Sequence, residues 1–332
     1  MKPAVSTMFH ARTVAFGDSN IGLVRENNED RFCIDEERGF FFVVDGMGGH
    51  KAGETAAEIA RSTIQKRLER NTGSVPDRIR EAITLANNDI FRQANENRAF
   101  QGMACVLTVA VIENGLVTAG HVGDSRLYLL TGEKIEKITR DHSPVGVLED
   151  ACKISEIEAI RHPNRNEVFR DVGSAKHLPV DDNFIDIYEF PLPPDSSLLL
   201  CSDGLTDLLT SQQIFSAYQA HKNFPRIFVE SLITGANEAG GKDNITVLVV
   251  TNLPRAGASR HIFLETQEIV VDAISGEITA ENMKLDAPPK TPSIIGIFFS
   301  RPAFLIYGIL LTVLAYLAWQ FLIAQGNLSL PN

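Results

Sequence analysis

Two uninterrupted apolar runs in this chain each end in an Asp-Gly pair, and a third run begins just after an aspartate. Residues 40–44 lead into Asp45-Gly46, residues 198–202 lead into Asp203-Gly204, and residues 245–250 follow Asp243 and Asn244. Runs of this length and composition are typical of buried strands, so each aspartate is expected on a rigid support at the edge of a core. One such aspartate indicates only a turn, but three suggest a cluster.

Carboxylates packed together repel one another unless they bind protons or a cation. Because all the donors are oxygens, the predicted cation is a hard one, Mn²⁺ or Mg²⁺. Gly46 and Gly204 would let the backbone turn tightly and approach such an ion. Two ions held by Asp45, Asp203 and Asp243 would bind a phosphate and activate a water for in-line attack on it. The pattern therefore predicts a hydrolytic metal centre.

Two further segments place charged residues near predicted strand boundaries. Arg25, Glu29 and Asp30 fall within one short stretch, and a guanidinium beside a metal cluster suits a phosphate because its donors match two oxygens at once. Asp124 lies between two predicted strands. Taken alone, residues 25–30 are more simply explained as a solvated loop, and Asp124 as a turn residue.

The segment from about residue 13 to 251 alternates between strand-like and helix-like patterns. Apolar residues recur close to the 3.6-residue period in 52–70 and 77–97, which predicts two helices. Closely spaced strands are predicted after them, and short connections join antiparallel neighbours. This pattern favours an α+β fold in which helices cover antiparallel sheets, rather than a doubly wound parallel sheet. The other predicted elements are strands at 13–16, 31–34, 39–44, 103–112, 116–121, 126–130, 134–138, 197–202 and 245–250, a long polar loop at 141–180 and a helix at 224–238.

Charge and cysteine content narrow the function classes. The net charge of −11 over 332 residues argues against a nucleic-acid partner, which would require a basic face. The four cysteines form no Cys-x-x-Cys pair, so they are expected to be buried thiols in a reducing compartment rather than disulfides or zinc ligands.

The C-terminal region differs in kind from the rest. Residues 303–324 contain no charged side chain and are mostly apolar, which is long enough to cross a bilayer as one helix. Basic residues precede this span and none follows it, so the large N-terminal part is expected on the cytoplasmic side of the cell inner membrane. The predicted organisation is a catalytic domain at 1–252, an extension with a proline-rich linker at 253–302, a transmembrane helix at 303–324 and a short tail at 325–332.

Six ordered motifs in this chain resemble those of one enzyme family. They are Ser19-Asn20-Ile21-Gly22-Leu23-Val24-Arg25-Glu26-Asn27-Asn28-Glu29-Asp30, Val44-Asp45-Gly46-Met47-Gly48-Gly49-His50, Gly123-Asp124-Ser125-Arg126, Asp141-His142-Ser143, Ser202-Asp203-Gly204-Leu205, and Gly240-Gly241-Lys242-Asp243-Asn244-Ile245-Thr246. Together they resemble the metal-dependent protein phosphatases of the PP2C type, especially the bacterial ones. The resemblance covers residues 13–251 and implies a four-layer αββα sandwich of two antiparallel sheets flanked by helices.

The resemblance also implies hydrolysis of phosphoserine and phosphothreonine in proteins with two Mn²⁺ or Mg²⁺ ions. Carried over by position, Asp45 would bridge the ions, the Gly46 carbonyl would bind one of them, and Asp203 and Asp243 would hold the first. Glu29 and Asp30 would orient water, Arg25 would bind the substrate phosphate, and Asp124 with Asp203 would form a weaker third metal site. The implied partners are phosphorylated proteins, with a serine/threonine kinase and its targets as candidates.

Two departures from the family pattern keep a second interpretation open. Met47 stands where eukaryotic relatives carry a histidine thought to act as general acid, and Gly102-Met103-Ala104-Cys105 replaces the usual Gly-Thr-Thr pattern. The alternative function is a catalytically inert phosphoprotein-binding scaffold with the same fold. Because every expected acidic position is filled, the sequence favours the active enzyme.

Overall fold

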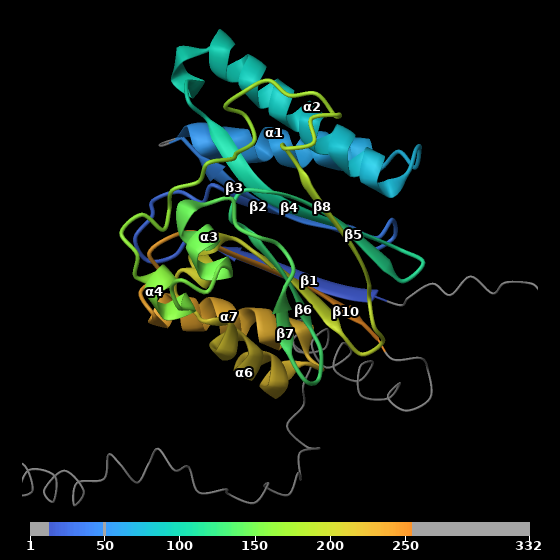
Figure 1. The fold of residues 1–332 in the computed structure, drawn as a ribbon, viewed down its shortest axis with the longest axis vertical. Helices are drawn as coiled ribbons and strands as arrows, with labels where there is room; N and C mark the ends of the chain where they lie inside the picture. Colours follow the sequence, from blue (N-terminus) through green and yellow to red (C-terminus); the bar gives the residue numbers. More distant parts are fainter. Residues whose placement is uncertain (1–12, 49–50, 254–332) are drawn as a thin grey trace, which may run out of the picture. The chain divides into compact units, whose positions relative to one another are not determined.

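Two five-stranded antiparallel sheets form the centre of the molecule in the computed structural model, which describes residues 13–48 and 51–253 (Figure 1). Every paired strand runs antiparallel to its neighbour. The first sheet has the order β1 (Thr13–Asn20), β10 (Ile245–Asn252), β9 (Ser197–Cys201), β6 (Arg126–Leu130), β7 (Ile135–Lys137). The second has the order β2 (Asp30–Asp35), β3 (Phe40–Met47), β4 (Ala104–Glu113), β5 (Leu116–Val122), β8 (Asp186–Pro191).

Helices cover the outer face of each sheet. In Figure 1, α1 (Lys51–Leu68) and α2 (Val75–Glu96) lie over the second sheet, and α6 (Ser211–His221) and α7 (Pro225–Glu238) lie over the first. Three apolar cores fill the spaces between these layers: one below α1 and α2, one between the sheets, and one above α6 and α7. The predicted α+β arrangement of two antiparallel sheets between helices is confirmed.

Local sequence explains why the longest helix forms where it does. The Ser74 side chain accepts a hydrogen bond from the Asp77 backbone N–H, and a proline occupies the first turn of α2, which together satisfy and preorganise the helix start. Its buried residues include Ile79, Ile83 and Ile90, and their spacing places them on the face that packs on the second sheet.

Several elements differ from the sequence-based prediction. The structure adds the edge strand β8 and the helix α6, and residues 141–180 hold two short helices, α3 (Pro144–Asp150) and α4 (Glu156–Ile160). A four-residue helix, α5 (Asp203–Thr206), and a 3₁₀ turn at Arg98–Phe100 complete the described elements. All four cysteines are free thiols, but Cys152 is exposed and Cys33 is only partly buried, so the expectation that all are buried was wrong.

The predicted C-terminal anchor cannot be placed on this fold. Residues 303–324, their flanking tail, and the extension after Leu253 lie outside the described residues. His50 and Gly49 of the second motif also lie outside them. Within 13–48 and 51–253, no helix has the length and apolar character needed to cross a bilayer. The predicted domain boundaries and the transmembrane helix therefore stay predictions.

Candidate functional site

A pair of carboxylates meets across the edge strand β2 and its neighbour β3 in the second sheet. Asp30 on β2 and Asp45 on β3 are direct register partners, an arrangement that brings opposite side chains close together. Asp30 is almost fully buried, at 2% exposed, whereas Asp45 is partly exposed. Like charges directly opposite one another destabilise a sheet, so this pair calls for a proton or a cation.

Asp30 also ties the two sheets together. Its Oδ2 atom accepts hydrogen bonds from the Ser202 hydroxyl at 2.7 Å and from the Thr246 hydroxyl at 2.6 Å. Its other oxygen, Oδ1, is buried and has no hydrogen-bond partner among the described residues. Burial raises the pKa of Asp30 to about 6, although the Thr246 and Ser202 hydroxyls act in the opposite direction. One carboxylate oxygen is thus held in place while the other is left available.

The remaining predicted acids come from the first sheet and from the crossing between sheets. Asp203 is the first residue of α5, directly after β9, and Asp243 lies just before β10. Because β9 and β10 are antiparallel neighbours, the end of one lies beside the start of the other. Asp124 lies in the short connection between β5 of one sheet and β6 of the other. The sequence-predicted acids therefore come from strand ends in both sheets.

Electrostatics link these acids. Burial raises the pKa of Asp45 and of Asp203 well above the usual range, and neighbouring carboxylates raise it further. For Asp45 the neighbours are Asp30, Asp203, Asp124 and Asp243, in that order. Burial also raises the pKa of Asp124 to about 7. These shifts indicate that the side chains share one weakly screened region, in which several negative charges together are unfavourable.

The glycine of each Asp-Gly pair is required by close backbone contacts. A Cβ atom on Gly46 would lie 2.2 Å from the Gly53 carbonyl oxygen, and one on Gly204 would lie 2.0 Å from the Asn244 carbonyl oxygen. Any side chain would therefore push these backbones apart. The Glu29 carboxylate is close by, because a Cβ atom on Gly53 would lie 2.6 Å from its Oε2 atom. Glu29 thus lies against the first turn of α1, where the helix dipole favours a negative charge.

Arg25 is held beside the acidic residues by Asp243. The Arg25 Nη2 atom lies 2.6 Å from Asp243 Oδ2, and about half of its side chain is exposed. Two residues that the sequence assigned to different tasks, phosphate binding and metal binding, are therefore paired here. Asn244 fixes the same loop: its amide group donates to the Ile21 and Asn27 carbonyls, and its side-chain oxygen accepts from the Glu29 N–H.

Ser202, Asn244 and Thr246 belong to the sequence motifs, but the sequence alone predicts no role for them. The structure makes all three supports of the acidic residues, and each is buried. Their only sequence signal is their place within three residues of Asp203 or Asp243. Their bonding partners lie on the distant β2 strand and its preceding loop, which no local pattern reveals.

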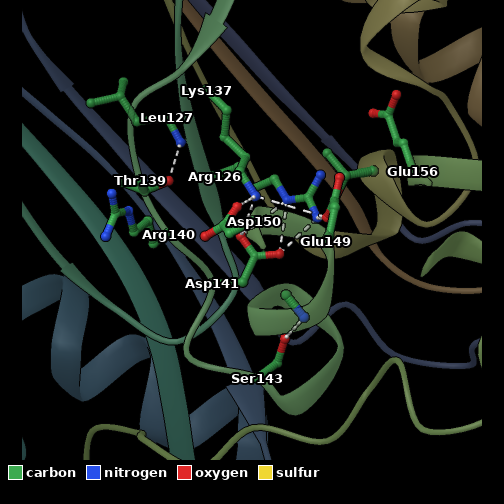
Figure 2. Close-up of polar contacts among 12 residues, drawn as sticks. Arg126, Leu127, Lys137, Thr139, Arg140, Asp141, Ser143, Glu149, Asp150 and Glu156 are labelled. Atoms are coloured by element: carbon green, nitrogen blue, oxygen red, sulfur yellow. Dashed lines mark hydrogen bonds and ion pairs between the residues drawn. The ribbon is translucent and has the colours of Figure 1, made fainter. Parts of the chain in front are cut away.

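A network of buried ion pairs lies next to Asp124. Figure 2 shows the Arg126 guanidinium between Asp141 and Glu149, with Nη2 at 2.7 Å from Asp141 and 2.9 Å from Glu149. Lys137 adds an ion pair with Asp150 at 2.7 Å. Burial would raise the pKa of Asp141, but Arg126 and Lys137 outweigh it and the pKa is lowered. The network joins β6 and β7 to α3, the first helix of the long polar segment.

Of the two departures from the family pattern, Met47 is only partly buried, whereas Met103, Ala104 and Cys105 are buried. Met47 is the register partner of Ala104 on β4, and Gly46 is the partner of Cys105. Met103 and Cys105 belong to the apolar core below α1 and α2, and both are almost fully buried. The departure from the Gly-Thr-Thr pattern is therefore a packing feature.

A divalent ion fits these residues in donor chemistry and in charge. The donors are carboxylate oxygens, and one of them, Asp30 Oδ1, is buried and has no hydrogen-bond partner among the described residues. Within residues 13–48 and 51–253, however, no group of three or more aspartate, glutamate, histidine or cysteine side chains is arranged so that it could bind one metal ion. The acidic residues therefore suit a divalent ion in the type of donor atom and in charge, and the role of each residue as a ligand stays a prediction.

Comparison with known proteins gives a consistent result. A family model described as protein phosphatase 2C matches residues 23–239. The serine/threonine phosphatase stp of Listeria monocytogenes is 32% identical over 237 residues, which make up 69% of this chain and 92% of that protein. The crystal structure of the Mycobacterium tuberculosis serine/threonine phosphatase PstP/Ppp superposes with a TM-score of 0.65 at 29% identity, over 73% of this chain and 99% of the other.

One similar structure also contains metal. It is a catalytic domain of the serine/threonine phosphatase PstP in complex with two manganese ions, with a TM-score of 0.64 at 28% identity, covering 73% of this chain and 98% of that one. The region matched by the family model, residues 23–239, contains the paired aspartates, Arg25 and the two Asp-Gly turns. On this sequence match and these relatives, the chain belongs to the protein phosphatase 2C family and is a protein serine/threonine phosphatase.

Proposed function

We propose that this phosphatase hydrolyses phosphoserine and phosphothreonine in proteins with two divalent ions, Mn²⁺ or Mg²⁺, bound at the acidic end of its two sheets. The observation that carries this proposal is the facing pair of Asp30 and Asp45, of which Asp30 is buried and keeps one oxygen unpartnered. Two such carboxylates are unfavourable together unless a proton or a cation neutralises them. The manganese-containing relative supports the same type of centre.

The residues would divide the work as follows. Asp45 and the Gly46 carbonyl would bind the ions, and Asp203 and Asp243 would be the further ligands of the first ion. Asp124 and Asp203 would form a weaker, third metal site. When bound, the ions supply an activated water and neutralise the phosphoryl oxygens. Asp30 has Oδ1 available to accept a hydrogen bond from water, since Oδ2 is already held by Ser202 and Thr246.

Arg25 and Glu29 would act on the substrate side. Arg25 is about half exposed and keeps one nitrogen with Asp243, which leaves its other N–H groups to bind phosphoryl oxygens in the forked geometry that a guanidinium favours. Glu29 would orient water together with Asp30. The leaving alkoxide needs a proton, and no residue is assigned to supply it.

The test is metal-dependent turnover of p-nitrophenyl phosphate and of a phosphothreonine peptide. We expect activity with Mn²⁺, loss on chelation, and a loss of at least about a hundredfold in Asp45→Asn and Asp203→Asn. Asp89→Asn, on the outer helix α2, is the matched control and should keep full activity. Undiminished turnover in either site variant would overturn the residue assignment. Phosphopeptide binding without turnover would favour the inert scaffold.

We further propose that residues 303–324 anchor the phosphatase to the cytoplasmic face of the inner membrane. The support is the absence of charged side chains in this stretch, with basic residues only before it. An anchor would raise the local concentration of enzyme near membrane-bound phosphoproteins, which suggests a membrane kinase and its targets as substrates. The full chain should stay with washed membranes and a chain ending at Pro288 should not. Retention of the shortened chain would contradict the anchor.

A further inference from the structure

Three large apolar side chains are exposed together on the loop between β1 and β2. Ile21 is 37% exposed, Leu23 is 69% exposed and Val24 is 65% exposed. Single exposed apolar residues are normal on a protein surface. Three within four positions contribute little to folding, however, and such a run is usually explained by binding.

The backbone of this loop is fixed although its side chains are exposed. The Leu23 N–H donates to the Gly241 carbonyl at 2.7 Å, and the Ile21 carbonyl accepts from Asn244 at 3.0 Å. Gly22 has a φ of +80° and lies so close to Asp243 that a Cβ atom would be 2.2 Å from its carbonyl oxygen. The loop is therefore held along the segment before β10, and its apolar side chains are presented without a further cost of ordering the backbone.

This apolar loop is continuous with the proposed phosphate position. Val24 directly precedes Arg25 in the sequence. Arg25 forms an ion pair with Asp243, and Gly22 packs against the backbone of the same aspartate. Leu23 lies over Gly241, where a Cβ atom would be 2.8 Å from the leucine Cγ atom. A peptide whose phosphate binds Arg25 would have its neighbouring residues close to this loop, because Leu23 and Val24 directly precede Arg25.

We propose that Leu23 and Val24 form a specificity surface that binds an apolar residue adjacent to the phosphoserine or phosphothreonine of the substrate. The proposal rests on the proposed function, in which Arg25 binds the substrate phosphate. An apolar substrate side chain would bury apolar area on both partners, and a partly buried leucine corresponds to a preference of about tenfold over a small polar residue. The surface selects for the sequence around the phosphate and leaves the chemical step unchanged.

The test compares kcat/KM for phosphothreonine peptides that differ only in the residues flanking the phosphothreonine, leucine in one set and serine in the other. Leucine is placed before the phosphothreonine in one peptide and after it in a second. We expect the full chain with Mn²⁺ to prefer one of the leucine peptides by about tenfold, and the double variant Leu23→Gln/Val24→Gln to lose most of that preference. Because the readout is a ratio between peptides, a general loss of activity in the variant cancels.

Leu85→Gln is the matched control, since Leu85 is 52% exposed on α2, and it should keep the preference of the unaltered protein. The proposal is overturned if the unaltered protein does not discriminate between the peptides, or if the double variant discriminates equally well. Absence of turnover with every substrate would instead reject the proposed function, so the two failures are distinguishable.

Discussion

Asp30 and Asp45 face each other across β2 and β3, and only Asp30 is also bonded to the opposite sheet. The pair thus lies where the two sheets are joined by side chains as well as by the apolar core between them. Asp30 is fixed by its two hydroxyl donors and cannot easily move away from its partner. The repulsion between the two carboxylates is consequently built into the fold.

This arrangement predicts that function and stability conflict at Asp45. Without divalent metal, Asp45→Asn should stabilise the protein by about 1 kcal/mol, because folding no longer has to place a second charge opposite Asp30 or bind a proton to neutralise it. With Mn²⁺, the unaltered protein should gain in melting temperature while the variant gains little, since ligands that bind only the folded state stabilise it. Thermal unfolding with chelator and with millimolar Mn²⁺ measures both effects. A variant that is less stable than the unaltered protein in chelator would contradict the prediction.

The hydroxyl groups that hold Asp30 should matter for both stability and activity. Thr246→Val keeps the shape of the side chain but removes the donor at 2.6 Å from Asp30. Ser202 still donates to the same oxygen, and the loss of a hydrogen bond to a charged group costs about 1–3 kcal/mol. We expect a loss of unfolding free energy in that range together with a fall in kcat, measured by urea unfolding and by turnover.

Thr251→Val is the control for this variant because it lies on the same strand and its hydroxyl is bonded to Ser197 instead. It should lose stability by a similar amount but keep its kcat. Equal losses of kcat in the two variants would show that the effect comes from strand β10 as a whole rather than from the position of Asp30.

The ion-pair network in Figure 2 predicts a large effect for Arg126. Arg126→Met leaves Asp141 and Glu149 buried without their main partner, and breaking a buried ion pair by removing one side costs about 3–5 kcal/mol. Arg92→Met removes ion pairs of an exposed arginine on α2 and should change stability by less than about 1 kcal/mol. Urea unfolding of the two variants makes the comparison. Similar losses in both would mean that the network is well solvated.

The sequence predicts the fully buried strands, but it misses two elements that are largely exposed or only partly buried, β8 and α6. Every residue of β9 and β10 is buried, so their apolar runs are continuous and easily recognised. The edge strand β8 has no fully buried residue, and α6 buries only Ile214 and Tyr218. Neither has enough apolar residues for a clear period, because contacts with the rest of the molecule stabilise them rather than their own pattern.

The same contrast applies to the site. The acidic residues were predictable because Asp45 and Asp203 directly end apolar runs. The support of Asp30 by Ser202 and Thr246 joins residues separated by 172 and 216 positions, and the pairing of Arg25 with Asp243 spans 218 positions. These contacts depend on which strands become neighbours, which the chain order alone does not specify.

The buried His121 predicts how stability changes with pH. Burial, with a contribution from His142, lowers the pKa of His121 to about 3, while Asp141, Asp186 and the Arg140 carbonyl act in the opposite direction. In the unfolded chain a histidine has a pKa of about 6.5, so between about pH 6.5 and pH 3 the unfolded state binds a proton that the folded state does not. This contribution destabilises the fold progressively as the pH falls through that window and vanishes above it.

His121→Gln should therefore flatten the pH dependence of the unfolding free energy. The expected difference in slope between the two proteins approaches about 1.4 kcal/mol per pH unit below pH 6. The variant should also be less stable at pH 8, because His121 is bonded to the Thr108 hydroxyl and to the Arg140 carbonyl. Urea unfolding at half-unit steps from pH 4.5 to pH 8 measures both quantities. All other titrating groups are common to the two proteins, so parallel curves would mean that His121 is protonated in the folded state over the same range as in the unfolded one.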